Sequence, residues 1–159
     1  LIRDSDKEAL KPPYVDSVIR FDISPDGRTI AAIGNQGIVY LLSPDNGDIL
    51  KQWQAHDGLA DIQFSPDGKR LFTAGHDKKL RLWNVASGKL LDERAAETYC
   101  TNTLAVLPDG ERVSTGGGGY RASIPGSTIG ATEGKTDGDY ALRIWRFADE
   151  SNASTSSKP

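Results

Sequence analysis

His56, Thr73 and Asp77 are the residues of this chain whose types could do chemistry together. A hydroxyl, an imidazole and a carboxylate are the nucleophile, the base and the orienting group of many acyl-transfer sites. Spacing alone allows such a triad here. The same groups also have a structural use, because a histidine can link a threonine hydroxyl to a carboxylate by hydrogen bonds. The elements that carry the three residues decide between these uses.

A glycine-rich stretch, GATEGKT at 130–136, looks similar to the phosphate-binding loop G-x-x-x-x-G-K-[ST]. Only three residues separate Gly130 from Gly134, and Ile129 occupies the position that the first glycine needs. The loop also requires a strand before it and a helix after it, whose N-terminus faces the phosphates. Neither flank has that pattern, so we do not expect nucleotide binding.

Composition argues against several other classes of site. The two histidines, His56 and His76, come without a carboxylate cluster, so no metal site and no cofactor are expected. Cys100 is the single cysteine and is interpreted as a small buried residue. The net charge of −3 predicts no nucleic-acid or membrane partner. No apolar run is long enough to span a bilayer and residues 1–11 lack a signal-peptide core, so the chain is expected to be soluble.

Three turn motifs show how the chain is organised: SPDGR at 24–28, SPDGK at 65–69 and LPDGE at 107–111. Proline presets φ, aspartate can bond its own backbone and glycine accepts a left-handed conformation, so each motif predicts a tight turn. The motifs recur at a nearly constant spacing, with their aspartates at Asp26, Asp67 and Asp109. The chain is therefore a tandem array of three units.

Strands are expected on both sides of each turn. Before the turns, apolar residues alternate with the period of a β-strand. The alternating pairs are Phe21 and Ile23, Ile62 and Phe64, and Leu104 and Val106. Further short apolar segments follow the turns, so a complete unit contains four antiparallel strands, and no helix of useful length is expected.

The segment FSPDGKRLFTAGHDKKLRLWNVASGK, residues 64–89, resembles the WD-repeat family, in which each repeat supplies most of one blade of a β-propeller. The resemblance covers about 14–147 and is weakest in the first unit. It implies an all-β fold of about three four-stranded antiparallel blades in an incomplete ring. In the family, the outer strand of one blade is followed by the inner strands of the next, so each sequence repeat straddles two blades.

The resemblance also implies a division of the chain. The expected parts are a leftover outer strand and linker at 1–13, blades at 14–53, 54–94 and 95–149, an insertion at 117–138 in the third blade, and a disordered tail at 150–159. Because the last unit stops after its third strand, the chain is expected to be the C-terminal part of a larger propeller. The remaining blades would come from a missing part of the chain or, as the alternative, from oligomerisation.

In the family, a histidine, a serine or threonine, an aspartate and a tryptophan form a hydrogen-bonded network that stiffens a blade. The resemblance places this network at His56, Thr73, Asp77 and Trp83 in the middle unit. A buried indole N–H needs an acceptor, which the threonine supplies. Because the network would engage all of these groups, the chain is predicted not to be an enzyme.

The network is expected to be incomplete in the other two units. The third unit keeps Thr115, Asp139 and Trp145 without a histidine, and we expect both Trp83 and Trp145 to be buried. The first unit has none of these residue types at the corresponding positions, Ala32, Gln36 and Leu42. Its blade would be held by packing alone, and Trp53 is interpreted as a contact between blades.

The predicted function is a non-catalytic protein-interaction scaffold whose partners are other proteins. Candidate contact residues are Tyr120 and Arg121 in the insertion, which are types enriched at interface hot spots, and Asp57 and Lys78 in neighbouring loops. The insertion is either a recognition loop or a neutral, mobile addition. The alternative function is a regulatory or sensory propeller attached to a catalytic or electron-transfer domain in a longer chain.

Overall fold

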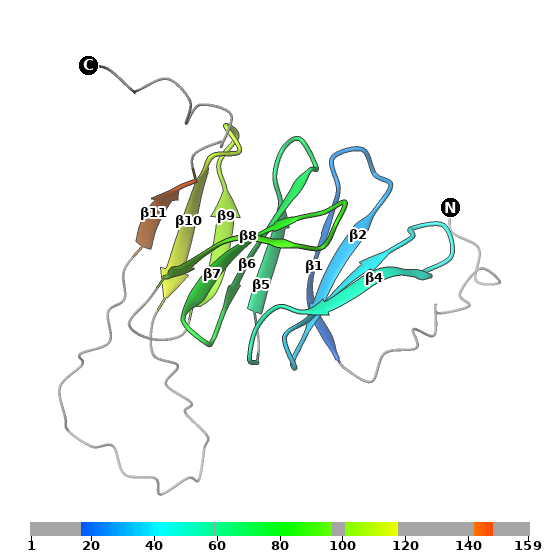
Figure 1. The fold of residues 1–159 in the computed structure, drawn as a ribbon, viewed down its shortest axis with the longest axis horizontal. Helices are drawn as coiled ribbons and strands as arrows, with labels where there is room; N and C mark the ends of the chain where they lie inside the picture. Colours follow the sequence, from blue (N-terminus) through cyan, green and yellow to red (C-terminus); the bar gives the residue numbers. More distant parts are fainter. Residues whose placement is uncertain (1–16, 59, 97–100, 118–141, 148–159) are drawn as a thin grey trace, which may run out of the picture.

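The computed structural model describes residues 17–58, 60–96, 101–117 and 142–147, in which every regular element is a β-strand (Figure 1). Sheet 1 has the order β1 (Val18–Ile23), β2 (Ile30–Gly34), β3 (Ile38–Leu42) and β4 (Ile49–Gln54). Sheet 2 has the order β5 (Ala60–Phe64), β6 (Arg70–Gly75), β7 (Lys79–Asn84) and β8 (Leu90–Ala95). Sheet 3 consists of β9 (Thr101–Val106), β10 (Arg112–Gly117) and β11 (Leu142–Arg146).

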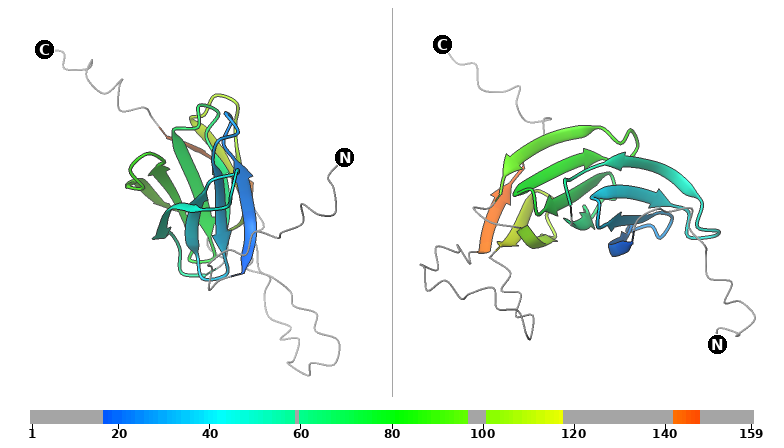
Figure 2. Two further views of the ribbon diagram at one scale, coloured as in Figure 1. Left: turned by 90° about the vertical axis from the view of Figure 1, so that its right-hand side faces the viewer. Right: turned by 90° about the horizontal axis from the view of Figure 1, so that it is seen from below.

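All neighbouring strands pair antiparallel, and the sheets follow one another along the chain. The inner strand β5 lies between β1 and β9, and the three sheets form an arc (Figure 2). The predicted all-β fold of antiparallel propeller blades is confirmed. Two of the blades have four strands, and the third has three within the described residues.

The repeated turns have the local chemistry that their sequence predicts. Gly27, Gly68 and Gly110 adopt positive φ angles of 71°, 69° and 69°, a conformation that glycine reaches without steric cost. In the second turn, the amide of Gly68 donates to the carbonyl of Ser65 at 2.8 Å. In the third, hydrogen bonds from the backbone and side chain of Arg112 lower the pKa of the neighbouring aspartate, Asp109, to about 2.

Apolar side chains fill the spaces between consecutive sheets, because alternate residues of each strand point to opposite faces. The core between sheets 1 and 2 contains Ala31, Ile33, Val39, Leu41, Ala55, Ile62, Phe64, Leu71 and Trp83. The core between sheets 2 and 3 contains Phe72, Ala74, Leu80, Leu82, Ala96, Leu104, Val113 and Phe147. The sheets therefore pack as adjacent blades, as predicted.

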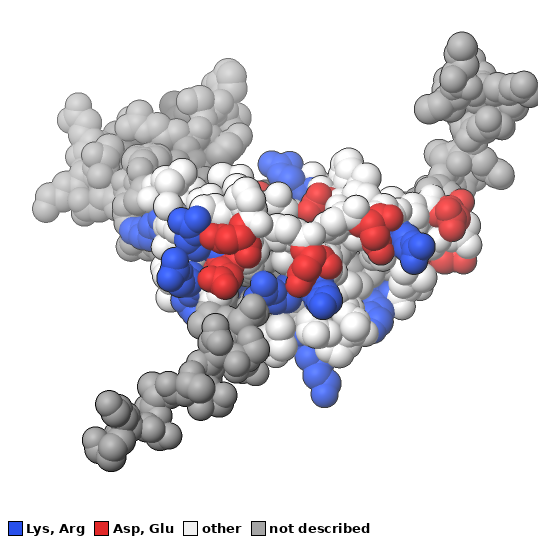
Figure 3. Space-filling model, turned by 90° about the horizontal axis from the view of Figure 1, so that it is seen from above, with Lys and Arg blue, Asp and Glu red and all other residues white. Residues whose placement is uncertain are grey.

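The edge of the molecule seen in Figure 3 carries acidic and basic side chains in close alternation. Ion pairs such as that between Arg112 and Asp109 neutralise charges locally.

Within the ranges given above there is no helix with the length and apolar character of a membrane span.

Candidate functional site

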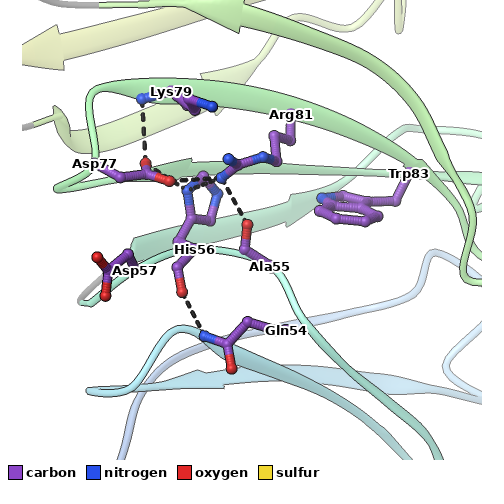
Figure 4. Close-up of a pocket in the computed structure, with 8 residues that line it drawn as sticks. All are labelled: Gln54, Ala55, His56, Asp57, Asp77, Lys79, Arg81 and Trp83. Carbon is purple, nitrogen blue, oxygen red and sulfur yellow. Dashed lines mark hydrogen bonds and ion pairs between the residues drawn. The ribbon is translucent and has the colours of Figure 1, made fainter.

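The candidate site lies at one edge of sheet 2, where two connections meet. His56 belongs to the loop between β4 and β5, and Asp77 belongs to the turn between β6 and β7 (Figure 4). Thr73 and Trp83 lie on β6 and β7. His56 is 2% exposed and Thr73 is fully buried. The fold thus brings together four side chains from two strands and two separate connections.

These four side chains form one continuous chain of hydrogen bonds. The indole Nε1–H of Trp83 donates to Oγ1 of Thr73 at 2.9 Å, and the hydroxyl of Thr73 donates to Nε2 of His56 at 2.7 Å. The Nδ1–H of His56 then donates to Oδ1 of Asp77 at 2.8 Å. This arrangement gives the buried indole, hydroxyl and imidazole groups a hydrogen-bond partner each.

Arg81 is a further member that sequence reasoning missed. Its Nη1 donates to Oδ2 of Asp77 at 2.7 Å and to the carbonyl of Ala55 at 2.6 Å, and its Nε donates to Oε2 of Glu93 at 2.7 Å. Lys79 also pairs with Glu93 at 2.7 Å. The period of the strand could have identified Arg81 from the sequence. Arg81 stands two residues before Trp83, so the two side chains lie on the same face of β7.

Burial and charge set the protonation states of the site. Burial lowers the pKa of His56 below its ordinary value of 6.5, against the opposing effect of Asp77, and the positive charge of Arg81 lowers it further. Burial raises the pKa of Asp77, but hydrogen bonds from Arg81 and His56 outweigh it, so this pKa is lowered overall. At neutral pH the imidazole is therefore neutral and the carboxylate is charged.

The protonation of His56 predicts a pH dependence of stability. Because the folded state holds the pKa of this imidazole below its unfolded value, the unfolded state binds more protons when the pH falls below about 6.5. We expect the melting temperature to decline between pH 7 and pH 5, above the range in which carboxylates titrate. Scanning calorimetry of the chain and of His56→Gln checks this, and a decline of equal size in the variant would assign the effect to other groups.

Two glycines make room for His56. A Cβ on Gly75 would lie 2.5 Å from Cγ of His56 and closer still to its Nδ1, and a Cβ on Gly37 would overlap the carbonyl of His56. Gly37 also accepts the amide of His56 through its carbonyl oxygen at 3.0 Å and has a φ of 74°. Sequence reasoning missed both glycines.

The third unit has a smaller version of the arrangement. Trp145 Nε1–H donates to Oγ1 of Thr115 at 2.8 Å, while Asp139 lies outside the described residues. The expectation that both tryptophans are buried is correct for Trp83, which is 6% exposed, and wrong for Trp145, which is only half-buried.

A difference in the preceding outer strand explains the exposure of Trp145. Trp83 is covered by Trp53 of β4, with ring centroids 5.6 Å apart, so Trp53 makes the predicted contact between blades. The equivalent residue of the next outer strand, β8, is Arg94, which instead places its guanidinium 4.3 Å from the ring centroid of Phe147. Trp145 therefore lacks the cover that a second indole would give it.

The first unit replaces the polar network with apolar packing. Its equivalent positions hold Ala32 and Leu42, which form a buried cluster with Tyr40. Gln36, the third equivalent position, accepts a hydrogen bond through its backbone carbonyl from the side chain of Gln54 at 2.6 Å. The three units thus share one fold but differ in these side-chain hydrogen bonds. The described part of the third unit keeps the bond between tryptophan and threonine, and the first unit has apolar packing in place of the network.

A shallow cleft of about 650 Å³ opens beside the network (Figure 4). Its lining residues are Gln54, Ala55, His56, Asp57, Asp77, Lys79, Arg81 and Trp83. The candidate contact residue Asp57 lines this cleft and is exposed. Lys78 lies in the adjacent turn, where it has a φ of 68°. Tyr120 and Arg121 lie outside the described residues.

The arrangement limits what the site can do chemically. The hydroxyl of Thr73 is fully buried and engaged by both Trp83 and His56, so it cannot reach a substrate in this geometry. In the part of the chain that the structure describes, no three His, Cys, Asp or Glu side chains are grouped to hold a metal ion.

Residues 47–84 match the family model for the WD domain, G-beta repeat. The matched span contains β4 of sheet 1 and β5 to β7 of sheet 2, so the sequence repeat straddles two blades. The predicted offset between sequence repeat and structural blade is therefore present here.

Three similar proteins extend this comparison. Eukaryotic translation initiation factor 3 subunit I of Emericella nidulans is 32% identical over 127 residues, covering 78% of this chain and 36% of that protein. Protein groucho of Drosophila melanogaster is 30% identical over 95 residues, covering 59% and 13%. The U3 small nucleolar RNA-associated protein 18 homolog of Arabidopsis thaliana is 28% identical over 97 residues, covering 60% and 18%. The chain thus spans between 13% and 36% of the length of these relatives. The repeat match, the blade-like sheets and the relatives together show that this chain belongs to the WD-repeat family.

Proposed function

We propose that this chain is a non-catalytic protein-interaction scaffold, and that the cleft beside His56 and Asp57 forms part of its docking surface. The observation that carries the proposal is the hydrogen-bond chain from Trp83 to Asp77, because it uses the polar groups that a catalytic site would need. This edge of sheet 2 therefore presents a rigid surface, surrounded by charged residues, to a partner protein.

The family supports this function in its general form. WD-repeat proteins act through protein–protein interactions. One of the relatives above is named as a subunit of an initiation factor, and a subunit is a component of an assembly. The second possibility, a regulatory propeller attached to a catalytic or electron-transfer domain, would use the same surface within a longer polypeptide. We favour the scaffold function because the hydrogen-bond chain of the described site supports it.

A charge reversal at the cleft tests the docking surface. Asp57→Lys changes an exposed side chain outside the hydrogen-bond chain, so we expect the melting temperature to stay within about 1 °C and the affinity for a protein partner to fall about tenfold. The partner is first identified by photo-crosslinking from position 57 of the full-length protein in cells, and its binding is then measured with purified components.

The matched control is Asp45→Lys. Asp45 is also exposed, but it lies in the turn between β3 and β4, at the opposite edge of the blades. Equal affinities of both variants and the unaltered protein would refute docking at the cleft. Turnover of a bound small molecule at this cleft would refute the non-catalytic assignment.

A further inference from the structure

Consecutive blades are joined by carboxylates on their inner strands. Asp22 on β1 accepts the amide of Phe64 on β5 at 2.8 Å, and Asp61 on β5 accepts the amide of Leu104 on β9 at 2.9 Å. In both bonds the acceptor is a side chain and the donor is the backbone of the next blade. Each inner strand is therefore held against the following one, and so is the turn at its end.

The turns that follow the inner strands lie at one edge of the blades, the upper edge in Figure 1. A Cβ placed on Gly68 would lie 3.3 Å from Cδ of Pro25, and one placed on Gly110 would lie 3.2 Å from Cδ of Pro66. The proline of each turn thus lies against the glycine of the following turn. Because this contact is the same at both interfaces, the turns can be compared position by position.

One position differs between the two interfaces. In the turn SPDGKR the last residue is Arg70, and its Nη2 donates to the carbonyl of Gly110 in the following turn at 3.0 Å. The equivalent residue of the turn SPDGRT is Thr29, and the turn that follows it contains Gly68. A threonine side chain ends at its γ atoms, so it reaches much less far than an arginine and carries no positive charge. The interface between sheets 1 and 2 therefore lacks the guanidinium that occupies the other interface.

A groove of about 540 Å³ opens at the interface between sheets 1 and 2, lined by both Thr29 and Gly68. Its apolar lining residues are Pro25, Phe64 and Val85. Phe64 is buried, Val85 is half-buried and Pro25 is exposed. The groove thus lies where the side chain of an arginine would lie if the first turn resembled the second, and it offers an apolar surface beside that position.

The charges of the groove favour a cation. Asp26 and Asp67 line it, one from each turn, together with Lys69, so the lining carries two negative charges and one positive charge. The hydrogen bond from Ser24 lowers the pKa of Asp26. Burial raises the pKa of Asp67, but the hydrogen bond from Ser65 and the other favourable contacts outweigh it, so this pKa is also lowered. Both carboxylates are therefore charged at neutral pH.

We propose that this groove binds an arginine side chain of a partner protein. The guanidinium would donate to the carbonyl of Gly68, just as Arg70 donates to that of Gly110. Asp26 and Asp67 would balance its charge, and its methylene groups would pack on the apolar lining. Arginine is favoured over lysine because its planar fork can bond to more than one acceptor at once.

The source of this arginine is taken to be a protein, because WD-repeat proteins act through protein–protein interactions. The groove lies at the turn edge of the blades, opposite the cleft beside His56. The proposal therefore stands or falls independently of docking at that cleft.

A short peptide tests the recognition directly. The probe is a capped pentapeptide of glycine and serine with one central arginine, and its matched controls carry citrulline or lysine at that position. We expect NMR titration of the purified chain to show binding of the arginine peptide at least about tenfold tighter than that of either control, with shifts at the amides of Gly68 and Lys69. Equal binding of the citrulline peptide or of the lysine peptide would overturn the proposal.

Filling the groove from within the chain gives a second test. In Thr29→Arg the new guanidinium should bond to the carbonyl of Gly68, so the melting temperature should not fall and the arginine peptide should bind at least about tenfold more weakly. Gln52→Arg adds the same charge at an exposed position of β4 outside the groove and should leave binding unchanged. An equal loss in both variants, or a lower melting temperature in Thr29→Arg, would overturn the proposal.

A third variant removes the two charges. Asp26→Asn combined with Asp67→Asn keeps a side-chain oxygen for the amides of the turns, so the chain should stay folded. The arginine peptide should nevertheless bind at least about tenfold more weakly. Unchanged binding would contradict recognition by these carboxylates. Self-association of the unaltered chain that Thr29→Arg abolishes would assign the groove to a second copy and overturn the choice of a partner protein.

Discussion

Replacing Trp83 with alanine is expected to lower the free energy of unfolding by about 3–5 kcal/mol, the usual range for truncating a large buried aromatic residue. Trp83 is 6% exposed, belongs to the core between sheets 1 and 2, and contacts Trp53. Its removal also leaves the hydroxyl of Thr73 without its indole donor. Urea denaturation of the chain and the variant at neutral pH measures the difference.

Trp145 provides the matched control for this experiment. Trp145 donates to Thr115 just as Trp83 donates to Thr73, but it is only half-buried. Trp145→Ala should therefore cost clearly less than Trp83→Ala. Equal losses in the two variants would contradict the conclusion that cover by Trp53 distinguishes Trp83 from Trp145.

A single methyl group at position 75 is expected to destabilise the protein by about 2–4 kcal/mol. In Gly75→Ala the new Cβ would lie 2.5 Å from Cγ of His56 and 2.9 Å from Oδ1 of Asp77, so the imidazole must move. Such a movement breaks the bonds of His56 to Thr73 and Asp77. Thermal and urea unfolding of the variant measure the loss.

A double-mutant cycle shows whether the imidazole is the cause. In a His56→Ala background the ring atoms that the new methyl group would meet are gone, so Gly75→Ala should cost much less there than in the unaltered chain. A cost that is the same in both backgrounds would show that position 75 does not act through the imidazole and would contradict the steric explanation.

Much of the fold could be predicted from local sequence. The three Pro-Asp-Gly turns specify their own backbone angles, and the period of two in segments such as Ile62 to Phe64 specifies strands, because both depend on residues close together in the chain. The nearly constant spacing of the turns then predicts similar sheets in sequence. The resemblance to WD repeats added the pairing of His56 with Asp77 and Thr73.

Other features depended on which distant residues become neighbours. Arg81 reaches Asp77 because the register of β6 and β7 places it opposite Thr73, and register is a property of two strands rather than one. Gly75 is required because His56 packs against it, and His56 comes from the connection between β4 and β5, far from Gly75 in the sequence.

The sequence by itself determined the strands, the turns and the order of the three units, since these follow from short-range periodicity and turn chemistry. The tertiary structure alone decided the exposure of Trp145 and the bridges from Asp22 and Asp61. The sequence around a carboxylate on a strand does not show which amide of the following unit will donate a hydrogen bond to it. That contact exists only once two blades have packed, because burial and hydrogen bonding between blades are set by both surfaces together.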